Sequence, residues 1–129
     1  MKDQTSSDSP EGLRVLVVED HADSATAIAR LLRSFGYQPQ VARDLKTAVE
    51  LADRAPFDLL ISDIRLPDGS GLDLMRQLRN LGPIKGIAMS GLASDADYQN
   101  SADAGFSAHL GKPLDFTSLR ETIDRVCAK

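Results

Sequence analysis

The sequence predicts an α/β fold in which helices cover both faces of a five-stranded parallel sheet, a doubly wound (βα)5 sandwich. From Leu13 onward, short apolar runs alternate with longer segments of helical period, and five such units fit the chain. Successive runs start roughly twenty or more residues apart, which leaves room for helical crossovers. Of the two common strand orders, 2-1-3-4-5 puts the strand that contains Pro39 at an edge, so we expect that order.

Five strands are expected from apolar runs of strand length. In chain order they lie at residues 14–18, 38–42, 58–62, 86–89 and 106–110. The first and the third have aliphatic centres, which is typical of central parallel strands that are covered on both faces. Pro39 cannot donate a hydrogen bond to a neighbouring strand, and this also favours an edge position for the second strand.

Five helices are expected where apolar residues recur at helical spacing. In chain order they run from Asp23 to Phe35, from Leu45 to before Pro56, from Leu72 to Leu81, from Ser94 to Ala104, and from after Asp115 to Val126. The expected N-caps are Asp23, Asp44, Ser94 and Asp115. The segment 66–71 is rich in turn-forming residues and is expected to be a loop. The fourth helix has the weakest apolar stripe.

Composition and charge limit the classes of protein that fit. The 129 residues suit one domain at 13–129, preceded by a polar segment at 1–12 that is expected to be a flexible tail or linker. The net charge of -4 and the pI of about 5.0 disfavour direct nucleic-acid binding. The sequence has one cysteine and no segment typical of a signal peptide or a membrane span, so we expect a cytoplasmic location without membrane insertion.

Four of the expected strands bring reactive side chains to one edge of the sheet. Glu19 and Asp20 follow the first strand, Asp63 the third, Ser90 the fourth and Lys112 the fifth. Ligands of such sheets bind beyond the carboxyl ends of the strands where the strand order reverses, here between the first and third strands. Three carboxylates at that point require a cation, and their hard oxygens suit Mg²⁺, with Mn²⁺ as a substitute. A phosphoryl group on Asp63 would also need a fixed cation and a hydroxyl donor, which Lys112 and Ser90 supply.

Each of these residues alone has a simpler explanation. Glu19 and Asp20 suit the N-terminus of the first helix, and Asp63 suits a turn. Ser90 suits a turn as a small residue, and Lys112 suits a solvated loop. Their combination at neighbouring strand ends favours the phosphoryl site.

Four segments of the chain carry a family pattern: Val17–Asp20, Leu60–Gly71, Met89–Gly91, and Ala104–Phe106 leading to Lys112–Pro113. With these segments the chain resembles the receiver domains of response regulators in two-component signalling, from Arg14 to Cys127. The resemblance implies a flavodoxin-like fold with Asp63 as the phosphoacceptor. It also implies that Glu19, Asp20, Asp63 and the backbone carbonyl of Arg65 hold Mg²⁺, directly or through water. Ser90 and Lys112 would then contact the phosphoryl oxygens, and the Lys112–Pro113 peptide bond would be cis.

The chain departs from the family pattern three residues before Lys112, where the family usually has Tyr or Phe as a switch residue. This chain has His109 there. Our hypothesis is that His109 swings toward Ser90 as the switch residue. The alternative, a half-buried strand histidine with satisfied hydrogen bonds, stays open.

The resemblance also implies function and partners. The domain would take a phosphoryl group from the phosphohistidine of a histidine kinase or phosphotransfer protein, and it would not be an enzyme beyond self-phosphorylation and autodephosphorylation. Phosphorylation would switch the face made by the fourth helix, fifth strand and fifth helix, which is also a candidate homodimer surface. Residues 88–91 and 108–115 are similar to receivers at the C-terminus of hybrid sensor histidine kinases, in which 1–12 would suit an interdomain linker.

Three other functions compete with the receiver function. A phosphatase of the haloacid dehalogenase type needs a second Asp two residues after its nucleophile, where this chain has Arg65. A flavodoxin would bind the FMN phosphate at the end of the first strand, where Glu19 and Asp20 would repel it. A receiver that serves only as a binding scaffold is disfavoured because every residue needed for phosphorylation is present.

Overall fold

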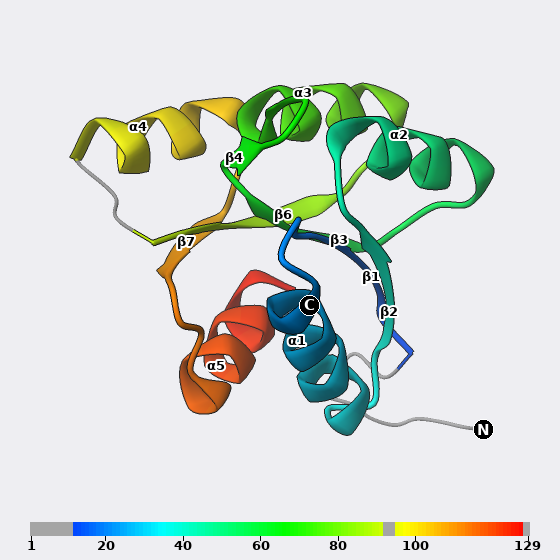
Figure 1. The fold of residues 1–129 in the computed structure, drawn as a ribbon, viewed down its shortest axis with the longest axis vertical. Coiled ribbons are helices and arrows are strands. Elements are labelled where there is room, and N and C mark those ends of the chain that lie inside the picture. Colours follow the sequence, from blue (N-terminus) through cyan, green and yellow to red (C-terminus); the bar gives the residue numbers. More distant parts are fainter. Residues whose placement is uncertain (1–11, 92–94, 128–129) are drawn as a thin grey trace.

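The computed structural model describes residues 12–91 and 95–127, and it has three layers. Figure 1 shows α2, α3 and α4 on one face of the sheet and α1 and α5 on the other. The helices are α1 (Ala22–Ser34), α2 (Leu45–Arg54), α3 (Gly71–Leu81), α4 (Asp95–Ala104) and α5 (Phe116–Val126). The strands of the sheet are β1 (Arg14–Val18), β2 (Gln38–Ala42), β3 (Leu59–Asp63), β6 (Lys85–Ser90) and β7 (Ala108–Gly111).

All neighbouring strands of this sheet are parallel, in the order β2-β1-β3-β6-β7. The predicted fold class and strand order are therefore confirmed. Pro39 lies in the edge strand β2, opposite Val15 of β1. Its missing N–H is tolerated there because one side of an edge strand has no neighbour in the sheet.

The core lies on both faces of the sheet because successive strand residues point to opposite sides. On the side of α1 and α5, one cluster includes Val15, Val17, Ile28, Leu32, Leu59, Ile61, Ile87, Leu119 and Ile123. On the side of α2, α3 and α4, a second cluster includes Leu16, Val18, Leu60, Leu74, Met75, Leu78, Ala88 and Phe106. The two clusters hold the strands rigidly, and hence the loops that leave their carboxyl ends.

Several predicted boundaries were wrong by one or two residues. The N-cap of α1 is His21, and Asp23 lies in the first turn, where its charge still favours the helix N-terminus. The strand predicted at 58–62 begins one residue later and includes Asp63, and the one predicted at 106–110 begins at Ala108. Phe106 instead packs into the core as part of the turn after α4.

Other predicted ends agree with the structure or fall outside it. Asp44 and Asp115 cap α2 and α5 by accepting the amides of Thr47 and Ser118. The predicted cap Ser94 and the tail at 1–11 lie outside the described residues. Gly12 is described, and its amide donates to the carbonyl oxygen of Gly36 over 3.2 Å. In the described part of the chain, no helix is both long and apolar enough to cross a bilayer.

The segment predicted as a loop at 66–71 contains a short antiparallel hairpin and the start of α3. Its strands are β4 (Arg65–Leu66) and β5 (Gly69–Ser70). Between them, the Asp68 carboxylate accepts the backbone amides of Leu45 over 2.7 Å and Lys46 over 3.1 Å at the N-terminus of α2. These bonds satisfy two helix amides that lack partners within the helix, and they tie the segment after Asp63 to α2.

Candidate functional site

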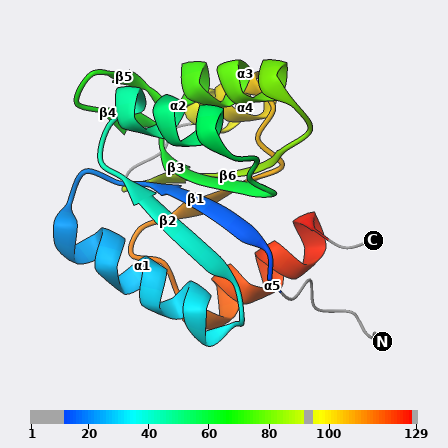
Figure 2. The ribbon, with the colours of Figure 1, turned by 90° about the vertical axis from the view of Figure 1, so that its right-hand side faces the viewer.

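The carboxyl ends of β1, β3, β6 and β7 lie side by side, at the end of the sheet opposite the two chain termini (Figure 2). Backbone hydrogen bonds hold the segments that leave these ends. They run from the amide of Glu19 to Ala42 over 3.0 Å, from Ile64 to Met89 over 3.2 Å, and from Lys112 to Ser90 over 2.8 Å. The predicted convergence of the reactive residues therefore has a backbone basis.

Lys112 joins the two most buried carboxylates of this end. Its Nζ lies 2.7 Å from Glu19 Oε1 and 2.5 Å from Asp63 Oδ1. The side chain of Glu19 is fully buried, and that of Asp63 is 8% exposed. The peptide bond between Lys112 and Pro113 is cis. One ammonium group balances only one of two carboxylates, so when both Glu19 and Asp63 are ionised the pair retains a negative charge that attracts cations.

Burial and mutual contact drive the pKa values of the two carboxylates apart. The pKa of Asp63 is raised to about 7, mainly by burial and further by the hydrogen bond with Glu19 and the negative charge of Glu19. The hydrogen bond and positive charge of Lys112 act in the opposite direction. Burial acts against ionisation of Glu19 too, but hydrogen bonds from Asp63, Lys112 and the His21 amide lower its pKa to about 2. In the metal-free protein the Glu19–Asp63 pair therefore shares one proton at acidic pH and loses it as the pH rises through about 7.

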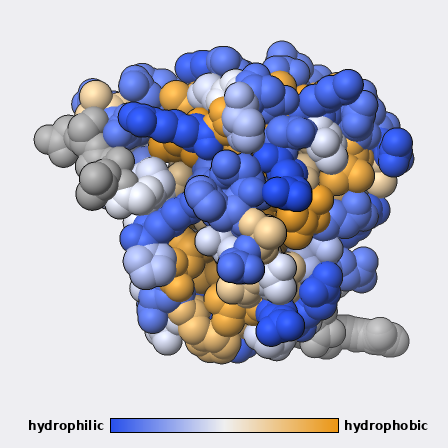
Figure 3. All heavy atoms as spheres, viewed as in Figure 1, coloured by the Kyte–Doolittle hydropathy of each residue, from blue (hydrophilic) through white to orange (hydrophobic). Residues whose placement is uncertain are grey.

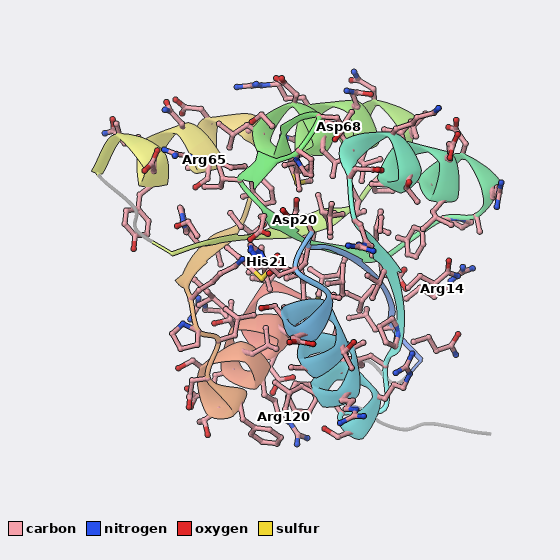
Figure 4. The ribbon with its side chains drawn as sticks, viewed as in Figure 1. Arg14, Asp20, His21, Arg65, Asp68 and Arg120 are labelled. Atoms are coloured by element: carbon pink, nitrogen blue, oxygen red, sulfur yellow. The ribbon has the colours of Figure 1, made fainter. Side chains whose placement is uncertain are left out.

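Asp20 and His21 lie next to each other at the end of β1 (Figure 4). Nδ1 of His21 is 3.3 Å from Glu19 Oε2 and 3.4 Å from Asp20 Oδ1. Glu19, Asp20 and His21 each offer a ligand atom within 4.8 Å of the others. The carboxylates of Glu19, Asp20 and Asp63 are hard oxygen donors, which suit Mg²⁺ better than a soft metal.

A cavity of about 650 Å³ opens over these groups. It is lined by Asp20, His21, Asp63, Ile64, Arg65, Met89, Ser90, Gly91, Asp97 and Lys112. The predicted site residues Asp20, Asp63, Arg65, Ser90 and Lys112 are thus brought together, with Glu19 beneath them. The exposed Arg65 lies toward α4 (Figure 4).

His109 on β7 faces Ser90 across the edge of the cavity, with its Nε2 2.8 Å from Ser90 Oγ. Its ring lies 4.3 Å from that of Tyr98 on α4. Burial lowers the pKa of His109, and the charge of Asp97 partly opposes this. The sequence pattern did not point to His21, which directly follows Asp20, or to Asp97 and Tyr98, which lie several residues beyond Ser90.

Comparison with known proteins decides the family. The profile of the response regulator receiver domain matches residues 15–124. The chain belongs to this family. The receiver domain also matches the fold of the chemotaxis protein CheY4 of Vibrio cholerae, with a TM-score of 0.84 and 26% identity over 88% of this chain and 98% of that one.

Two curated relatives place similar receiver domains in longer proteins. The response regulator protein PilR of Pseudomonas aeruginosa is 37% identical over 111 residues, which are 85% of this chain and 25% of PilR. The sensor histidine kinase RcsC of Salmonella typhi is 30% identical over 119 residues, which are 90% of this chain and 12% of RcsC. The chain thus spans a quarter or less of the length of these relatives.

We expect the metal-free receiver domain to lose stability between pH 6 and pH 8 as Asp63 ionises. The pKa of Asp63 is raised from 3.8 to about 7 on folding, so the stabilisation is present below pH 3.8 and is lost as the pH rises through about 7. The contribution of Glu19 has the opposite sign and is lost only as the pH falls through about 2.

The comparison that isolates Asp63 is thermal unfolding of the wild type and of Asp63→Asn at both pH values in the presence of a chelator. The wild-type midpoint should fall relative to that of the variant, which has no carboxylate to ionise at this position. Parallel pH responses of the two proteins would contradict the raised pKa.

Proposed function

We propose that this receiver domain accepts a phosphoryl group on Asp63 from a phosphohistidine of a histidine kinase or phosphotransfer protein. The observation that carries the proposal is the position of Lys112, whose ammonium group contacts the Asp63 carboxylate at the edge of an open cavity. In the transfer, an Asp63 oxygen attacks phosphorus, the bond from phosphorus to the imidazole nitrogen breaks, and the electron pair stays on the donor imidazole. The product is an acyl phosphate, and water resets it.

The residues around Asp63 have separate parts in this proposal. Lys112 neutralises charge on one phosphoryl oxygen, and Ser90 donates a hydrogen bond to another. Glu19, Asp20, Asp63 and the backbone carbonyl of Arg65 would hold Mg²⁺. The bound ion would neutralise negative charge on the phosphoryl oxygens. This arrangement makes the domain a phosphoacceptor switch and not a catalyst of other substrates.

A groove beside the site suits a phosphoryl donor. It has a volume of about 340 Å³ and is lined by Glu19, Ser24, Ala27, Ile28, Leu31, Lys112, Pro113 and Leu114. Figure 3 shows hydrophobic side chains exposed between α1 and the start of α5 on this face. Glu19 and Lys112 belong to both the groove and the site, so a partner that fills the groove has its phosphohistidine close to Asp63. The match to a sensor histidine kinase supports a partner of this class, in the cytoplasm where ATP is available.

The response to phosphorylation is proposed to pass through His109 to the face of α4, β7 and α5. Ser90 contacts His109 in this structure. A phosphoryl group that recruits the Ser90 hydroxyl would therefore change the hydrogen bonding of His109 and favour another arrangement of α4. The same face is the candidate homodimer surface.

The proposal is tested by incubating the chain with acetyl phosphate and Mg²⁺ and measuring its intact mass. We expect one phosphoryl adduct, no adduct with a chelator, and loss of the adduct in hydroxylamine, which cleaves acyl phosphates but not phosphate esters. An adduct that resists hydroxylamine would exclude Asp63 as the acceptor. Steady turnover of a small phosphate ester would favour the dehalogenase-type phosphatase, and a yellow purified protein would favour the flavodoxin.

A further inference from the structure

A chain of side-chain hydrogen bonds runs from the proposed phosphoryl site into α4. Ser90 Oγ lies 2.8 Å from His109 Nε2, and His109 Nδ1 lies 3.1 Å from Ser101 Oγ. Ser101 is 2% exposed, a buried polar residue in a helix whose only other buried side chain among the described ones is Ala104. The imidazole therefore has a hydroxyl partner at each ring nitrogen.

The contact between Ser101 and Tyr98 determines which way the protons point. Ser101 Oγ lies 2.9 Å from the backbone carbonyl oxygen of Tyr98, one turn earlier in α4. A carbonyl oxygen can only accept, so at this distance the Ser101 hydroxyl must donate to it. Since the hydroxyl has one proton, Ser101 can then only accept from His109, whose Nδ1 must carry the hydrogen.

The tautomer of His109 sets the direction of the next bond. A neutral imidazole has one N–H, so a hydrogen on Nδ1 leaves Nε2 as an acceptor. Burial lowers the pKa of His109 and thus favours the neutral ring, although Asp97 and its negative charge act in the other direction. Ser90 must therefore donate its hydroxyl proton to Nε2.

We propose that Ser101 is a positioning residue that fixes His109 in the Nδ1–H tautomer and thereby draws the Ser90 hydroxyl proton away from the cavity at Asp63. This inference rests on the proposed function for its consequence. Ser90 has one proton, so it cannot donate to His109 and to a phosphoryl oxygen at the same time. Ser101 therefore opposes the phosphorylated state until Nε2 becomes protonated or the ring moves.

The proposal explains why a weakly apolar helix buries a serine against β7. Phosphorylation would withdraw the Ser90 proton from Nε2 and leave the acceptor without a donor. The ring would regain a bond by carrying hydrogen on Nε2, either as the other tautomer or as the imidazolium. In the other tautomer, Nδ1 carries no hydrogen and can no longer donate to Ser101, so the phosphoryl group would act on α4 through Ser101.

The tautomer is measured in the unphosphorylated protein by long-range ¹H–¹⁵N correlation of the imidazole rings. The chain has two histidines, so His21→Gln assigns the signals of His109. We expect hydrogen on Nδ1 in the wild type and in Ser101→Thr, which keeps the hydroxyl, and a shift toward Nε2–H in Ser101→Ala. Hydrogen on Nε2 in the wild type, or an unchanged tautomer in Ser101→Ala, would overturn the assignment.

A second measurement connects the tautomer to phosphorylation. At fixed concentrations of acetyl phosphate and Mg²⁺, we compare the ratio of phosphorylated to unphosphorylated protein. This ratio should be about fivefold higher for Ser101→Ala than for the wild type, the change that the loss of one hydrogen bond produces. Ser101→Thr should stay near the wild type, and circular dichroism checks that each variant is folded. If the wild type takes no phosphoryl group, the proposed function fails while the tautomer result stands. If phosphorylation proceeds but Ser101→Ala leaves the ratio unchanged, the positioning role fails.

Discussion

Asp63→Asn should take up no phosphoryl group from acetyl phosphate under conditions in which the wild type becomes phosphorylated. The amide nitrogen has no lone pair available for attack, and the amide oxygen is a far weaker nucleophile than a carboxylate. Folding should survive, because the variant retains the ion pair of Lys112 with Glu19 and loses a carboxylate whose ionisation burial opposes. Intact-mass measurement after equal incubation gives the result.

The matched control is Asp53→Asn, the same chemical change on the exposed surface of α2. This variant should be phosphorylated as fast as the wild type. An adduct on Asp63→Asn equal to that on Asp53→Asn would move the acceptor to another residue and remove the basis of the proposed function.

Gly71→Ala should be the most destabilising single methyl addition near the site. A Cβ at position 71 would overlap the backbone carbonyl oxygen of Asp63 and come within 3.0 Å of Ser62 Oγ. Neither can move freely, because the Gly71 amide donates to Ile64 over 2.7 Å and Ser62 donates to the Asp63 carbonyl over 2.8 Å. The overlap should cost about 3 kcal/mol, which exceeds the gain of about 1 kcal/mol from replacing glycine in a helix.

Urea unfolding monitored by circular dichroism measures this change. Gly82→Ala is the control: Gly82 follows α3 in extended backbone at φ 166°, and none of the described residues has an atom within 4 Å of the added methyl group. Its unfolding free energy should match the wild type within about 0.5 kcal/mol. Gly71→Ala should also be phosphorylated more slowly, since relief of the overlap displaces Asp63. Equal unfolding free energies of the two variants would show that the turn before α3 can shift to accommodate the methyl group without loss of stability.

The hydrogen-bond partners that matter most were not predictable from the pattern. The pattern predicts Asp68 as one of several turn residues, but its carboxylate accepts the amide of Leu45, the first residue of α2, which is 23 positions away. The pattern predicts only that Ser101 lies in a weakly apolar helix, but its hydroxyl contacts His109 inside the molecule. Periodicity says which face of a helix is buried, and it does not say which polar group lies opposite a buried hydroxyl.

The sequence by itself determined the parallel sheet, its order and the meeting of Glu19, Asp63, Ser90 and Lys112 at one end. These follow from local rules: aliphatic runs form central strands, crossovers keep the strands parallel, and residues after such strands share one edge. Only the tertiary structure decided that Lys112 is shared by Glu19 and Asp63, that Asp68 holds the hairpin to α2, and that His109 lies between Ser90 and Ser101. Such contacts depend on distances of a few ångströms between segments that are far apart in the chain, and the packing of the two core layers sets those distances.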